Sequence, residues 1–124
     1  MRFRSTGLLI AAALLASPLF AHAAGDAAKG KTVFAKCMAC HAVVAGKNGV
    51  GPSLFGVVGR ASGTVPGYTY SEDLKKLNLT WTPENIDKWV TNPKAMAPKT
   101  KMTFPGLNNA DDRANLIAYL DTLK

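Results

Sequence analysis

The hydrophobic and polar positions of this chain predict a helix at each end of one domain. Asp26 can cap a first helix that carries Val33 and Phe34 and continues to Lys36. Asn109 can cap a last helix, because two acidic residues follow it and suit the positive end of a helix. The apolar positions of this last helix recur at helical spacing: Leu116, Ile117, Leu120 and Leu123, with Tyr119 nearby.

The middle of the chain predicts two shorter helices joined by long loops. Ser71 can cap one with Leu74 and Leu77 on one side, and Thr82 followed by Pro83 starts the other. The second helix carries Ile86, Trp89 and Val90, and Asn92-Pro93 ends it. Between residues 42 and 66, glycines at 46, 49, 51, 56, 59 and 63 indicate a loop. The predicted fold class is all-α, with about four to five helices.

The first 23 residues have the pattern of a cleaved secretory signal peptide. Arg2 and Arg4 form a positive start, an apolar run covers residues 8–15, and Ala21-His22-Ala23 offers small residues at the cleavage positions. The run is too short to span a membrane as a helix, which disfavours an uncleaved anchor. We therefore expect export to the periplasm and a single mature domain of residues 24–124.

Basic residues outnumber acidic residues along the chain. There are 15 lysines and arginines against 8 aspartates and glutamates, a formal charge of +7. Loss of Arg2 and Arg4 with the leader leaves the mature part basic. A basic surface suits nucleic acid, anionic lipid or an acidic protein partner. Export argues against nucleic acid.

The run Cys37-Met38-Ala39-Cys40-His41 carries the most specific chemistry of the sequence. Two thiols at this spacing can add across the two vinyl groups of a haem while the next residue, a histidine, coordinates its iron. A thiol oxidoreductase is disfavoured because no strand precedes the pair. A zinc site would need about four ligands, and one of the two histidines leaves with the signal peptide. A plain disulfide between the two cysteines is the main alternative.

The second axial ligand of such a haem has several candidates. Loss of His22 excludes a second histidine from the same chain, which leaves a methionine, a lysine, a weaker donor or no ligand. Met38 lies inside the attachment loop and cannot easily reach the opposite haem face. Met102 is favoured because residues 98–106 are irregular and interrupted by prolines, so this loop can lie across a haem face. Met96 can instead fill a gap in the core.

Short motifs occur in a characteristic order along the whole mature chain. Besides the attachment run they are Gly25-Asp26-Ala27-Ala28-Lys29-Gly30, Gly51-Pro52-Ser53-Leu54, Gly67-Tyr68-Thr69-Tyr70, Trp81, Asn92-Pro93-Lys94, Thr100-Lys101-Met102-Thr103-Phe104 and Leu116-Ile117-Ala118-Tyr119-Leu120. In these motifs the chain resembles the class I cytochromes c, specifically the bacterial soluble relatives of mitochondrial cytochrome c. The resemblance implies a small cytochrome c fold wrapped around one covalently bound haem c, with His41 and Met102 as axial ligands.

The resemblance also implies roles for residues around the haem. The carbonyl of Pro52 would fix the tautomer of His41. The haem propionates bring negative charge into a partly buried place and need hydrogen-bond donors. By resemblance the donors are Arg60, Tyr70, Trp81 and Thr100. The chain departs from the mitochondrial pattern at Trp89 and Leu74, where tyrosine and asparagine are common.

The implied coordination predicts an electron carrier and not an enzyme. With both axial positions filled no substrate reaches the iron, and one-electron transfer through the exposed haem edge remains. A sulfur ligand and an apolar pocket both raise the reduction potential. The expected monomer would shuttle electrons between respiratory or photosynthetic partners: a bc-type complex, an oxidase, a reaction centre or a periplasmic oxidoreductase.

Lysines are expected to steer the protein to acidic partners. Those near the haem motifs are Lys36, Lys47, Lys94, Lys99 and Lys101. Two rival functions belong to other classes. A small peroxidase or gas-binding protein requires an open sixth position with polar groups beside it, and a haem-free thiol protein would use the cysteines alone.

Overall fold

The computed structural model describes residues 25–124, and this range is helical. The helices are α1 (Ala27–Phe34), α2 (Glu72–Lys75), α3 (Pro83–Thr91), α4 (Pro93–Met96) and α5 (Ala110–Asp121). The described range holds no strand, only an isolated bridge between Ala61 and Thr80. The predicted all-α class with about four to five helices is confirmed. The predicted signal peptide, residues 1–23, lies outside the described residues.

Four helices begin at the caps that the sequence predicts. Each capping side chain accepts a hydrogen bond from the backbone N–H three residues further on, because that group has no partner inside the helix. The caps are Asp26, Ser71, Thr82 and Asn109, with bond lengths of 3.0, 3.3, 3.2 and 3.0 Å. The first helix ends at Phe34, two residues before the predicted Lys36. Leu77 and Leu123 lie beyond the ends of α2 and α5 but still pack against the core.

The short helix α4 is missing from the sequence prediction. Pro93 ends α3 as expected, and it is also the first residue of α4. Proline lacks the N–H that the first turn of a helix leaves unbonded, and its fixed φ suits that position. The same residue therefore stops one helix and starts the next.

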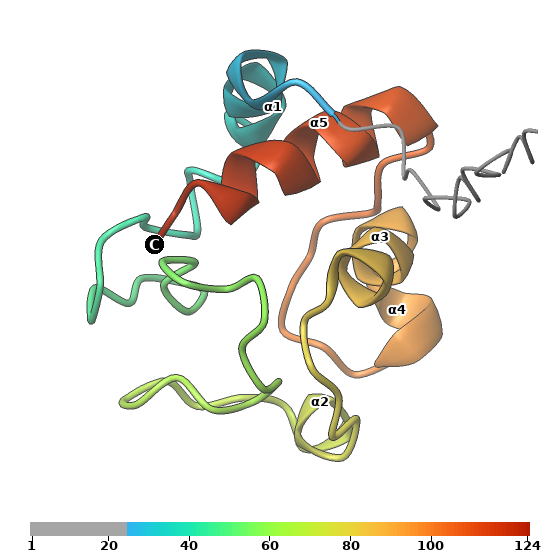
Figure 1. Cartoon of the computed structure of the whole chain (residues 1–124). Coiled ribbons are helices and arrows are strands. Elements are labelled where there is room, and N and C mark those ends of the chain that lie inside the picture. Colours follow the sequence, from blue (N-terminus) through green and yellow to red (C-terminus); the bar gives the residue numbers. More distant parts are fainter. Residues whose placement is uncertain (1–24) are drawn as a thin grey trace, which may run out of the picture.

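Two glycines allow the terminal helices to cross in close contact. A Cβ added at Gly30 would collide with the carbonyl of Asn115, and one at Gly25 would collide with the carbonyl of Ala114. Beside the crossing, the rings of Phe34 and Tyr119 lie with centroids 5.2 Å apart. Figure 1 shows α1 packed across α5.

The remaining elements lie on the side of α5 away from α1. In Figure 1, α3 and α4 lie below one end of α5 and the loop of residues 42–70, coloured green, lies below the other end. The chain end closes onto this loop, where the Gly56 N–H donates to the Leu123 carbonyl at 2.5 Å. Within the described range no helix is long and apolar enough to cross a membrane.

Candidate haem pocket

The apolar core of the protein surrounds a cavity of about 390 Å³. Every residue of the buried core except Ala97 and Leu107 lines it: Phe34, Val57, Trp81, Ile86, Trp89, Val90, Leu116 and Leu120. Because protein interiors are close-packed and small domains are stable by only about 5–15 kcal/mol in total, a core built around such a cavity is suited to an apolar group that fills its centre.

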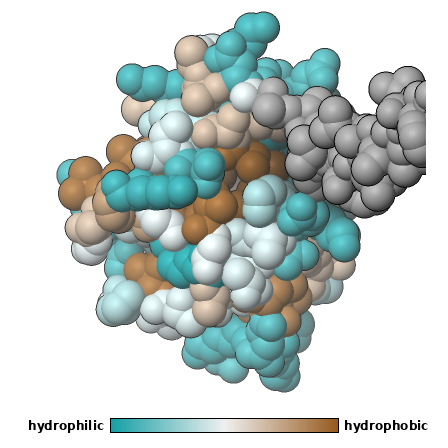
Figure 2. Space-filling view, viewed as in Figure 1, coloured by the Kyte–Doolittle hydropathy of each residue, from teal (hydrophilic) through white to brown (hydrophobic). Residues whose placement is uncertain are grey.

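The cavity reaches the protein surface beside the cysteine motif. Val50 lines the cavity and is 72% exposed, and Met38 between the two cysteines is 65% exposed. Figure 2 shows apolar surface emerging between hydrophilic residues on one face of the molecule. A group bound in the cavity would therefore be buried for most of its extent and reach solvent at one edge.

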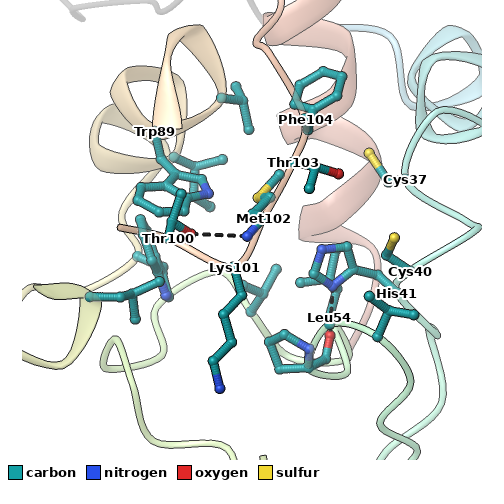
Figure 3. A pocket seen from close by; sticks show the side chains of 18 of the residues that line it. Cys37, Cys40, His41, Leu54, Trp89, Thr100, Lys101, Met102, Thr103 and Phe104 are labelled. Atoms are coloured by element: carbon teal, nitrogen blue, oxygen red, sulfur yellow. Dashed lines mark hydrogen bonds between the residues drawn. The ribbon is translucent and has the colours of Figure 1, made fainter. Parts of the chain in front are cut away.

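Cys37 and Cys40 lie at the wall of this cavity on the turns that follow α1. The Cys37 N–H donates to the Phe34 carbonyl at 2.8 Å, and the Cys40 N–H donates to the Cys37 carbonyl at 3.1 Å. These turns direct both sulfurs toward the pocket, close to His41 (Figure 3). Both cysteines are free, so the structure does not form the alternative disulfide.

The cysteines also differ from those of a thiol oxidoreductase or a zinc site. Burial, with a contribution from Cys40, raises the pKa of Cys37 to about 11. A nucleophilic cysteine has a lowered pKa instead, since the thiolate is the reactive form. Within residues 25–124 no group of three or more histidine, cysteine or acidic side chains is placed to hold a metal ion. The raised pKa of Cys37 therefore disfavours a thiol oxidoreductase.

His41 is held in one orientation by the loop that follows it. Its Nδ1 lies 2.7 Å from the Pro52 carbonyl, and since a carbonyl can only accept, Nδ1 carries the proton. This leaves Nε2 with a free lone pair, as a metal ligand requires. Burial lowers the pKa of His41, although the Pro52 hydrogen bond opposes this shift. The imidazole is therefore neutral at physiological pH.

Gly51 makes room for this imidazole, a role that the sequence analysis missed. A Cβ added at Gly51 would meet three atoms of the His41 ring, with Nδ1 at 2.7 Å and Nε2 at 3.0 Å. Gly51 is buried. In the sequence it was one of the six glycines that indicate a loop between residues 42 and 66. Its position directly before Pro52 is the one signal that distinguishes it.

The two candidate methionines have different places in the structure. Met102 lines the cavity from the loop of residues 98–106, and Figure 3 shows its side chain and that of His41 directed into the same pocket from different segments. Met96 ends α4, packs against the core and does not line the cavity. Of the two methionines, Met102 is therefore the one that lies beside a group bound in the cavity.

The four polar residues expected near the propionates all line the cavity: Arg60, Tyr70, Trp81 and Thr100. The Tyr70 hydroxyl accepts from the Val65 N–H at 3.0 Å, and the Thr100 hydroxyl accepts from the Met102 N–H at 3.2 Å (Figure 3). Both hydroxyls thus keep their own proton for a ligand.

Arg60 lines the cavity and also holds a neighbouring loop by hydrogen bonds. Its Nη1 donates to the carbonyls of Ser53 and Phe55, at 3.0 and 3.2 Å, and so fixes the loop that follows His41. Burial lowers the pKa of Arg60, and the neighbouring Tyr70 opposes this shift. A guanidinium remains charged at neutral pH, so Arg60 brings positive charge to the cavity wall.

Tyr68 was quoted in a motif but not predicted as a site residue, and it also lines the cavity. Its hydroxyl donates to the Val50 carbonyl at 3.1 Å, and its ring meets that of Tyr70 edge-on with centroids 4.7 Å apart. Trp89 and Leu74, the two departures from the mitochondrial pattern, lie on the wall as well. Trp89 packs edge-on against Trp81 with centroids 5.6 Å apart.

The sequence of this chain is similar to those of known cytochromes c. The cytochrome c family model matches residues 27–124. A cytochrome c2 of Rhodopila globiformis is 48% identical over 101 residues, which are 81% of this chain and 95% of the relative. A cytochrome c2 of Rhodomicrobium vannielii is 50% identical over 103 residues, 82% of each chain.

A solved structure of a cytochrome c also matches this chain in fold and in sequence. Cytochrome cH from Methylobacterium extorquens superposes with a TM-score of 0.74 at 47% identity, covering 79% of this chain and 99% of that one. The predicted fold, a small cytochrome c fold around a central group, is thereby confirmed. The chain belongs to the cytochrome c family, as a class I member similar to the bacterial cytochromes c2, and is an electron-transfer protein with one covalent haem c.

Proposed function

We propose that this protein is a soluble periplasmic carrier of single electrons whose haem iron is ligated by His41 and Met102. The observation that carries the proposal is the convergence of these two side chains on one cavity, with Cys37 and Cys40 at its wall. Haem c supplies an iron that alternates between the ferric and ferrous states. Occupation of both axial positions leaves electron transfer as its reaction.

The side chains of this protein would hold and tune that group. Cys37 and Cys40 provide the two thiols for attachment, and the Pro52 carbonyl keeps the lone pair of His41 on Nε2. Thr100, Tyr70, Trp81 and Arg60 offer donors to the propionates. The apolar wall disfavours the extra positive charge of the ferric state, which raises the reduction potential.

Electrons would pass at the edge where the cavity meets the surface near Val50. Lys36 and Lys101 line the cavity, and their charge favours acidic docking surfaces. Partners of this kind are redox proteins or membrane complexes: a bc-type complex, an oxidase, a reaction centre or a periplasmic oxidoreductase. Lys101 also donates to the Thr69 carbonyl at 2.8 Å, so it has a structural task as well as a charge.

Absorption spectra of the exported holoprotein test the ligation. We expect the weak ferric band at the red end of the visible spectrum that marks sulfur ligation, and no reaction of the ferrous form with carbon monoxide. Rapid carbon monoxide binding together with peroxidase turnover would favour the rival haem enzyme. Absence of haem-linked peroxidase stain on denaturing gels would favour the thiol protein.

The mass of the protein isolated from the periplasmic fraction tests whether the predicted signal peptide is cleaved. Cleavage after Ala23, which follows the small residues of the predicted site, leaves a mature chain of residues 24–124 plus one haem. A mass that includes residues 1–23 would show that the segment stays attached as an anchor.

A further inference from the structure

The loop that carries Met102 is tied to residues 69–73 by two hydrogen bonds. The Lys99 N–H donates to Oδ2 of Asp73 at 2.5 Å, and the Lys101 ammonium donates to the Thr69 carbonyl at 2.8 Å. The first bond joins residues 26 positions apart and the second joins residues 32 positions apart. Both bonds therefore link the neighbourhood of Met102 to a distant part of the chain.

The Met102 loop has little other backbone bonding. The Thr100 N–H bonds the Ala97 carbonyl at 3.0 Å and the Leu107 N–H bonds the Val90 carbonyl at 2.7 Å. Between them, residues 101–106 make no backbone-to-backbone hydrogen bond with any described residue. An attachment at Lys99 thus restrains a segment that its own backbone does not hold.

Asp73 is itself fixed in position on α2. Its Oδ1 accepts from the Ser71 hydroxyl at 2.7 Å and from the Leu74 N–H at 3.0 Å, which leaves Oδ2 for Lys99. The Ser71 hydrogen bond is the main cause that holds the pKa of Asp73 below its usual range. The group is therefore a carboxylate at neutral pH, and hydrogen bonds to a charged acceptor are stronger than those to a neutral one.

We propose that Asp73 is a positioning residue for the sixth iron ligand: its carboxylate anchors the Met102 loop at Lys99 and keeps the sulfur directed into the cavity. The inference rests on the proposed ligation by Met102. Asp73 itself touches neither the cavity nor the methionine. It acts through the backbone of Lys99, three residues before Met102.

Asp73→Asn is the most selective variant, because the shape is kept and only one acceptor is lost. The single amide oxygen can stay with Ser71 and Leu74, which turns the amide NH₂ toward the Lys99 N–H, so that two donors face each other. Glu72→Gln is the matched control. It removes the same charge from the neighbouring residue, whose carboxylate pairs only with the exposed Lys75 at 3.2 Å.

Titration of the ferric holoproteins with imidazole measures how readily the methionine gives way to another ligand. We expect Asp73→Asn to bind imidazole about fivefold more tightly than wild type, the effect of one lost hydrogen bond. The red sulfur band should weaken at lower temperature than in wild type. Glu72→Gln should differ from wild type by less than about twofold, since an exposed pair contributes little.

A second control separates the anchor from fraying of α2. Ser71→Ala removes the cap of α2 and one local bond of Asp73 but leaves Oδ2 for Lys99. Equal imidazole affinity in Asp73→Asn and Glu72→Gln would overturn the inference. An effect of Ser71→Ala larger than that of Asp73→Asn would also overturn it, because the helix and not the anchor would then hold the loop.

Hydrogen exchange of the Lys99 amide distinguishes failure of this inference from failure of the proposed ligation. Exchange at this amide reports the anchor directly and does not depend on the iron ligand. We expect faster exchange in Asp73→Asn than in Glu72→Gln, and equal rates would overturn the anchor. A wild-type protein without the red sulfur band, but with a protected Lys99 amide, would refute Met102 as ligand and with it the positioning role.

Discussion

Two segments that line the cavity are built in different ways: the His41 wall, residues 37–52, and the Met102 wall, residues 98–106. The His41 wall is held by contacts within a short stretch of chain: the His41 N–H bonds the Cys37 carbonyl at 3.0 Å, the Gly51 N–H bonds the Cys40 carbonyl at 2.8 Å, and the imidazole bonds Pro52 at 2.7 Å. The Met102 wall is an irregular loop whose bonds to Asp73 and Thr69 cross 26 and 32 residues.

This difference predicts which side of the cavity opens first. Opening the His41 wall requires breaking several hydrogen bonds between residues close together in the chain. The Met102 loop can move when only a few long-range hydrogen bonds are lost. The His41 wall should therefore persist under mild perturbation while the Met102 wall responds. Four changes test this contrast, beginning with the largest expected effect.

The double substitution Cys37→Ala with Cys40→Ala should abolish both walls together. Without attachment the apolar cavity lacks its filling group, so most of the buried core residues lose their packing partner on one side. We expect little folded protein by circular dichroism and no haem stain on denaturing gels. Met38→Ala, at the exposed position between the cysteines, is the control and should fold normally. A native fold without haem in the double variant would contradict the role of the cavity.

Met102→Ala should open one wall and leave the other intact. Loss of the sulfur frees the sixth position, so the reduction potential falls and the ferrous form binds carbon monoxide. Potentiometry and carbon monoxide difference spectra measure both effects. Met96→Ala is the control, since Met96 packs against the core and does not reach the cavity. If the two variants behave the other way round, Met96 is the ligand.

Gly51→Ala should disturb the His41 wall by steric conflict. The new Cβ would overlap the imidazole ring, and such overpacking costs about 1–3 kcal/mol. Denaturant unfolding of the holoprotein measures the loss. Gly49→Ala is matched in place, because its Cβ would meet only the Cys40 carbonyl at 3.3 Å. Equal stability of the two variants would show that the His41 wall yields more easily than its local bonds indicate.

Charge reversal around the cavity should have the smallest effect and leave both walls in place. Replacing Lys36, which lines the cavity, with glutamate should slow the bimolecular rate with an acidic redox partner by about threefold at low ionic strength. Lys101 also lines the cavity but is spared because it holds the Thr69 carbonyl. The control reverses Lys31, which lies on α1 and does not line the cavity. Stopped-flow rates that are equal at low salt would point to an apolar docking surface.

The same contrast separates what sequence reasoning predicted from what it missed. The four helix caps were predicted correctly, because a cap bonds a group three residues away and its partner is visible in the sequence. The wall of Cys37, Cys40 and His41 was predicted for the same reason. The preference for Met102 came from the irregular loop around it, and the place of this residue at the cavity agrees.

Three features were not predicted. Pro93 was identified as a helix end, but the continuation into α4 was missed, because proline suits both the residue after a helix and the first residue of the next one. The steric role of Gly51 was missed because it depends on how the loop folds back onto the His41 ring, ten residues earlier in the chain. The bond between Asp73 and Lys99 joins two surface residues that no spacing rule connects.

The sequence by itself determined the attachment chemistry, four of the five helix starts in the described range and the basic character of this protein, since each follows from residue types that the sequence shows directly. Only the tertiary structure decided which side chains meet across the cavity and how the Met102 loop is anchored. The physical reason is that local bonds form wherever their residues are neighbours in sequence. Long-range bonds exist only after the helices have packed and brought their partners within about 3 Å of each other.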